Sequence, residues 1–188
     1  MKLARLLSLS GILLATIQTA SAADLPGLRT TEAPWPLEIA HLKERLELIG
    51  IPALKSEGTV LHLHQRMDLF INGKAFPVPP LIGINPVAGF ISPIHTHDET
   101  GVIHIESFTI VPYTLGQFFD IWGVRLTDTC LGGYCNTGEK KLRVYVNGKP
   151  VGSNPREILL ANDQAIVVTY GTAKELPNPI PSVFKGPS

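Results

Sequence analysis

The 188-residue sequence contains little that would tie it to a nucleic acid, a nucleotide or a lipid bilayer. Its sixteen basic residues balance its sixteen acidic ones, so no net charge attracts an acidic partner such as nucleic acid. The longest apolar run, residues 6–20, is shorter than the roughly 20 residues that a membrane helix needs, and we expect no stable membrane span. The chain also lacks a phosphate-binding glycine loop, a nucleophile elbow and a zinc-protease helix motif. The sequence identifies no protein partner.

The first 22 residues have the pattern of a signal peptide rather than of folded structure. Lys2 and Arg5 precede the apolar run, and Ala20-Ser21-Ala22 is a small-residue cleavage site. We therefore expect cleavage after Ala22 and export to the periplasm or the extracellular space.

Cysteine is scarce, and the chain contains only Cys130 and Cys135. In an oxidising compartment a close, isolated pair of cysteines favours a disulfide over a thiolate metal site. A loop this short would stabilise the fold by about 2 kcal/mol in the loop-entropy model. A redox pair would more typically have the C-x-x-C spacing beside a βαβ pattern, which is absent.

Glycine and proline are abundant, with 17 and 16 residues, which indicates many turns and a β-rich chain. We predict a mainly β fold, a β-sandwich-like domain with an N-terminal helix and one short internal helix. Residues 23–58 would form a lead-in with the first helix, residues 59–174 a β-rich metal-site domain, and residues 175–188 a Pro-rich flexible tail.

Periodicity places the individual elements. Pro36–Ile49 has a helical apolar stripe, and the internal helix begins at Thr114 with a capping box to Gln117. Thr59–Ile71 alternates as a strand that ends in Asn72-Gly73, a strong hairpin pattern. The phrase around Asn72-Gly73 is repeated at 145–150, which predicts a second hairpin.

Five of the six histidines lie between positions 62 and 104. His62 and His64 form one H-x-H pair and His95 and His97 a second, while His104 precedes Glu106 in the same spacing. Residues i and i+2 of a strand project to one side about 6–7 Å apart, so two imidazoles can reach one ion. We expect His62 and His64 to lie on the polar face of their strand and both pairs to converge.

Imidazole and carboxylate groups are ligands of transition metals. The candidate ligands are the five histidines, His95, His97, His62, His64 and His104, and the candidate carboxylate ligands or supporting partners are Asp98, Glu99, Glu106 and Asp68. Because Met67 is the only methionine after cleavage and the cysteines are expected to pair, the composition favours copper(II) or zinc over copper(I). A purely structural network of histidines and carboxylates is the alternative.

These residues allow three classes of function. The first is an exported metal-binding protein for storage, delivery or sensing of copper or zinc. The second is an extracytoplasmic metalloenzyme, an oxidoreductase or a hydrolase, with Asp98 or Glu99 as general base. The third is an interaction module without metal. The sequence assigns no catalytic residue.

The chain resembles a family of secreted bacterial proteins whose function is uncharacterised. The resemblance extends from Leu61 to Tyr170 and rests on four phrases: His64–Lys74, His95–Glu106 (HTHDETGVIHIE), Tyr113–Gly123 and Cys130–Cys135. It implies an exported protein and supplies no activity.

Overall fold

The computed structural model describes residues 25–186, so the predicted signal peptide lies outside the described residues. It is mainly β with two α-helices, as predicted. The helices are α1 (Leu42–Leu48) and α2 (Leu115–Trp122), and η2 (Pro155–Glu157) and η3 (Ala173–Glu175) are short 3₁₀ turns. The strands are β1 (Leu61–Ile71), β2 (Lys74–Phe76), β3 (Ile84–Asn85), β4 (Phe90–Ile91), β5 (Ile94–His95), β6 (Val102–Ser107), β7 (Cys130–Leu131), β8 (Tyr134–Cys135), β9 (Lys141–Val146), β10 (Lys149–Pro150) and β11 (Gln164–Gly171).

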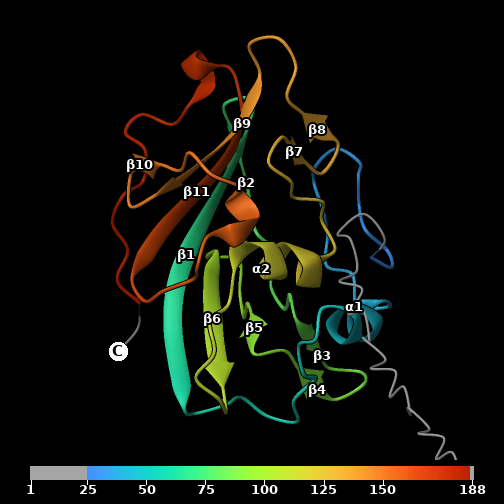
Figure 1. Cartoon of the computed structure of the whole chain (residues 1–188). Helices are drawn as coiled ribbons and strands as arrows, with labels where there is room; N and C mark the ends of the chain where they lie inside the picture. Colours follow the sequence, from blue (N-terminus) through green and yellow to red (C-terminus); the bar gives the residue numbers. More distant parts are fainter. Residues whose placement is uncertain (1–24, 187–188) are drawn as a thin grey trace, which may run out of the picture.

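One seven-stranded sheet dominates the structure (Figure 1). Its order is β10-β9-β11-β1-β6-β5, and β2 pairs with the end of β1. The long strand β1 pairs in parallel with β11 and antiparallel with β6 and β2. Two short hairpins, β3–β4 and β7–β8, lie outside this sheet. Strand β1 therefore connects the two halves of the sheet.

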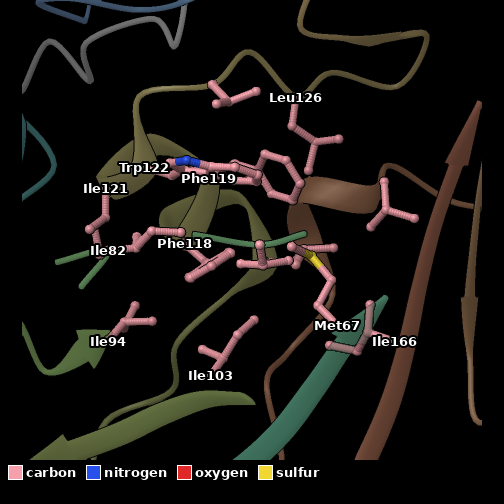
Figure 2. Close-up of a cluster of buried hydrophobic side chains, with 14 of the residues drawn as sticks. Met67, Ile82, Ile94, Ile103, Phe118, Phe119, Ile121, Trp122, Leu126 and Ile166 are labelled. Atoms are coloured by element: carbon pink, nitrogen blue, oxygen red, sulfur yellow. The ribbon is translucent and has the colours of Figure 1, made fainter. Parts of the chain in front are cut away.

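Helix α2 covers one face of the sheet with apolar side chains (Figure 2). Phe118, Phe119 and Trp122 are at most 2% exposed, and they belong to one cluster with Met67 and Ile103 of the strands. The side chain of Thr114 accepts from the N–H of Gln117, and the side chain of Gln117 accepts from the N–H of Thr114. Gly123 ends the helix at φ 70°. The predicted capping box and core stripe are confirmed.

On β1 and β6 the opposite face of the sheet carries polar groups, whereas on β11 it carries the buried Ala165 and Val167. In β6, Ile103 and Ile105 are fully buried in the core, whereas His104 and Glu106 alternate with them and point to the other side. In β1 the alternation is the same, with His62 and His64 on the face away from Met67. The alternation of each strand therefore separates the core from a histidine-bearing face.

The apolar stripe predicts a helix over Pro36–Ile49, but α1 begins only at Leu42 and is shorter. The carbonyl of Glu38 accepts from the buried guanidinium of Arg45 at 3.0 Å instead of from the backbone of a helical turn. The carboxylate of Glu38 also binds Arg45 and the N–H of His41. These bonds hold residues 36–39 as an irregular lead-in.

Four further predictions can be compared with the structure. Cys130 and Cys135 form a disulfide that closes the β7–β8 hairpin, as predicted. Asn72-Gly73 and Asn147-Gly148 each form a hairpin turn, β1–β2 and β9–β10. Within residues 25–186, none of the helices is long and apolar enough to cross a membrane. The C-terminal segment has no strand after β11 as far as residue 186, where the N–H of Gly186 donates to Asp163.

The capping box of α2 gives a first testable expectation. Thr114→Ala should lower the free energy of unfolding by about 1 kcal/mol, because the N–H of Gln117 loses its acceptor. Chemical denaturation followed by circular dichroism measures the change. Thr31→Ala, at an exposed site, is the control and should leave stability nearly unchanged. Equal losses in both variants would contradict the role of the cap.

Candidate metal centre

Three neighbouring strands place histidines side by side on the polar face of the sheet. His104 of β6 lies opposite His64 of β1 on one side and opposite His95 of β5 on the other. The next pair along β1 and β6 is His62 opposite Glu106. The ring of His97 lies against that of His104, with 4.5 Å between the centroids, so the five predicted histidines come together although they are spread over 43 positions of the sequence.

The first H-x-H pair, His62 and His64, directs both Nε2 atoms to one place. These atoms are 3.1 Å apart, and the ring centroids are separated by 4.6 Å. Two ligands of a tetrahedral ion with bonds of about 2 Å lie about 3.3 Å apart. His64 is buried at 7% exposure, whereas the side chain of His62 is 56% exposed. The first pair thus has ligand spacing and reaches solvent through His62.

The second H-x-H pair, His95 and His97, repeats this arrangement with 3.2 Å between its Nε2 atoms. Between them, the buried Thr96 exchanges backbone hydrogen bonds with Leu81 and Ile82, which holds the segment extended beyond the end of β5. His95 Nδ1 lies 3.0 Å from the carbonyl oxygen of Ser92. A carbonyl only accepts, so Nδ1 carries the proton and Nε2 presents its lone pair to the site.

His104 and Glu106 lie between the two pairs. Glu106 Oε1 is 3.2 Å from His62 Nε2 and 3.5 Å from His104 Nδ1, and Oε2 is 3.7 Å from His95 Nε2. His104 Nδ1 and Glu106 Oε2 are buried without a hydrogen-bond partner. Buried polar atoms are seldom left unpaired, and two such atoms side by side among the histidines are what an empty ligand position would leave.

Burial favours the neutral form of three histidines of the centre, His95, His104 and His64. It lowers the pKa of His95 to about 3, with the neighbouring His97 and His104 acting in the same direction. Burial, followed by the nearby His97 and His64, lowers the pKa of His104 to about 4. The pKa of His64 is lowered too, by burial and by His62. Neutral imidazole is the form that binds a metal, so the site is ready for one at neutral pH.

The pKa of Glu106 moves the other way. Burial raises it above the ordinary value, and the negative charge of Glu57 adds to the increase. A carboxylate whose charge is disfavoured in this way gains most from a cation.

The other predicted carboxylates do not join the centre. Asp98 accepts from the hydroxyl and the backbone N–H of Thr100, which lowers its pKa and commits it to the turn before β6. Asp68 is paired with Arg66 at 2.9 Å. Glu99 is exposed and lines surface pockets with Pro77 and neighbouring residues. Within residues 25–186, Glu106 is the only one of the four candidate carboxylates that contacts the histidines.

Glu57 is a residue of the site that sequence reasoning missed. Its Oε1 is 3.5 Å from His97 Nε2, and the N–H of the following Gly58 points to the carbonyl of Glu106 at 3.4 Å. Glu57 comes from an irregular segment before β1, outside any H-x-H or H-x-E spacing. In the sequence, Glu57 is marked only by the glycine that follows it, and an acidic residue beside a glycine is too common to indicate a site.

Two overlapping sets of side chains could hold a metal ion among the described residues. One set is His62, His64, His104 and Glu106, and the other is His95, His97, His104 and Glu106. Within each set, one ligand atom from every residue lies within 4.8 Å of the others. The donors are imidazole nitrogens with one carboxylate, which fits first-row transition metals.

Comparison of the chain with family models, with curated proteins and with solved structures gives no significant match. The resemblance to secreted bacterial proteins therefore stays a prediction, and the side chains of the centre are what indicate a function.

Proposed function

We propose that this is an exported protein that binds copper or zinc and serves in storage, delivery or sensing of the metal. The observation that carries the proposal is the convergence of two H-x-H pairs, with Nε2 separations of 3.1 and 3.2 Å, around the buried Glu106. Imidazole with carboxylate suits copper(II) and zinc, and the cysteines are held in a disulfide. Export follows from the N-terminal pattern of the sequence.

A metal explains the centre better than a structural network does. A network of hydrogen bonds would pair the buried polar atoms, yet His104 Nδ1 and Glu106 Oε2 have no partner. His95 Nε2 directs a lone pair toward His97 Nε2, an orientation that suits two ligands of one ion as well as a hydrogen bond donated by His97. Metal ions that accept these lone pairs would satisfy the groups that hydrogen bonds leave unpaired.

The exposure of the outer histidines favours binding and exchange. The side chains of His62 and His97 are 56% and 41% exposed, so an ion can enter and leave by replacing one solvent-facing ligand at a time. Storage, delivery and sensing all require such exchange.

A metalloenzyme is the second candidate, and one observation favours it. A surface pocket of about 370 Å³ is lined by Glu57, Lys55, Asn85 and Phe90, among others. Because Glu57 also lies 3.5 Å from His97, a small molecule in this pocket would be close to a metal bound at the centre.

Metal binding by the mature chain, residues 23–188, tests the proposal. The protein is purified, stripped with a chelator and titrated with copper(II) and with zinc(II), and bound metal is measured by mass spectrometry after dialysis. We expect bound metal in the wild type and a large loss in the His95→Ala/His97→Ala variant, with His41→Ala as the matched exposed control. Near-zero metal in the folded wild type with both ions would overturn the proposal.

A further inference from the structure

We propose that the centre holds two metal ions rather than one, with the carboxylate of Glu106 as a bridge between them. This inference rests on the proposed metal-binding function and specifies the nuclearity of the same site. Each ion is held by one H-x-H pair.

The histidine nitrogens define two places for an ion, not one. Each pair has its own short Nε2 separation, and the two sets of ligand atoms with mutual distances below 4.8 Å contain one pair each. Ligands around one tetrahedral ion lie only about 3.3 Å apart, which each pair meets by itself. A single ion between the two pairs would have to take ligands from both of them.

The orientation of Glu106 fits a bridge. Its Oε1 faces the first pair, 3.2 Å from His62 Nε2, and its Oε2 faces the second pair, 3.7 Å from His95 Nε2. One carboxylate oxygen is therefore available to each ion. Protein sites with two metals usually place them about 3.5–4 Å apart, a separation that a bridging carboxylate spans.

Additional ligands are present on both sides. His104 Nδ1, buried and unpaired, is 3.5 Å from Glu106 Oε1 and completes the set around the first pair. Glu57 Oε1, 3.5 Å from His97 Nε2, stands beside the second pair. Each ion thus has two imidazoles, one oxygen of Glu106 and a fourth side chain within reach, which matches four-coordinate geometry.

The charges agree with two ions as well. Four imidazoles and His104 are neutral ligands, while Glu106 and Glu57 bring two negative charges to the centre. The carboxylates of Glu57 and Glu106 both lie beside the second pair, and a second cation would relieve the repulsion between them.

Stoichiometry and metal–metal coupling test the inference. The stripped mature protein is titrated with copper(II) by calorimetry, and the loaded protein is measured by electron paramagnetic resonance and X-ray absorption. We expect two equivalents, a spin-coupled spectrum and a metal–metal distance of about 3.5–4 Å. Glu106→Gln, which keeps the shape but removes one ligating oxygen, should abolish the coupling and weaken the second ion at least about 100-fold. Asp98→Asn is the acidic control outside the centre and should keep both ions and the coupling.

The outcomes separate this inference from the proposed function. No bound copper or zinc overturns both. One equivalent with an uncoupled spectrum leaves metal binding in place and overturns the dinuclear centre. Two uncoupled equivalents, or coupling that survives in folded Glu106→Gln, would rule out the bridge.

Discussion

Replacing His104 by alanine should lower the affinity for copper or zinc at least about 100-fold, since loss of even a supporting residue of a metal site costs 10–100-fold. His104 belongs to both candidate ligand sets, and its ring is within 5.5 Å of the rings of His64, His95 and His97. Competition titration against a chelator of known affinity measures the loss.

His62→Ala and His41→Ala provide the comparison. His62 belongs to one set and its side chain is 56% exposed, so its loss should reduce affinity less than that of His104. His41 pairs with Glu38 outside the centre and should have no effect. An affinity of His104→Ala equal to that of His41→Ala, in folded protein, would show that His104 is no ligand.

The alternation of polar and apolar residues made much of the centre predictable. A strand has a period of two, so the positions of Met67 and Ile103 in the core fix the side on which His64 and His104 project. The capping box of α2 and the Asn-Gly turns are local as well, and they occur where the sequence places them. Features that depend on a few neighbouring residues could be derived without the structure.

The pairing of strands could not be derived in the same way. Convergence of the histidines depends on β6 lying between β1 and β5, and on the register that sets His104 opposite both His64 and His95. Register follows from long-range packing, which includes the parallel pairing of β1 with β11, some hundred residues later. The alternation indicates the face of the sheet on which the histidines lie, and the strand register determines the distances between them.

The carboxylates show where sequence proximity misleads. Asp98 is next to His97 in the chain, but its oxygen serves the turn through Thr100. Short polar side chains commonly bind their own backbone two residues on, which competes with any other use. Glu57, by contrast, is about forty residues from the second pair and contacts it only because its segment returns beside β6.

The metal-free protein should lose stability as the pH falls from 7 to 5. An unfolded histidine has a pKa near 6.5, whereas the pKa of His95 is about 3 and that of His104 about 4 in the folded protein. Below pH 6.5 the unfolded chain therefore binds protons that the folded protein does not, which favours unfolding. Each such group costs about 1.4 kcal/mol per pH unit, or about 2 kcal/mol between pH 6.5 and 5.

Glu106 acts in the opposite direction, because a raised pKa lets the folded protein keep a proton that the unfolded chain has released. It offsets part of the loss from the two histidines, and we expect a net decrease from pH 7 to 5 that is smaller than the roughly 4 kcal/mol of the two histidines alone. Urea denaturation of chelator-treated protein at several pH values measures it. His95→Asn, whose amide can still donate to Ser92, should flatten the profile, while His41→Asn should leave it as in the wild type. A slope that His95→Asn does not change would mean that the buried imidazole is not the group that titrates on unfolding.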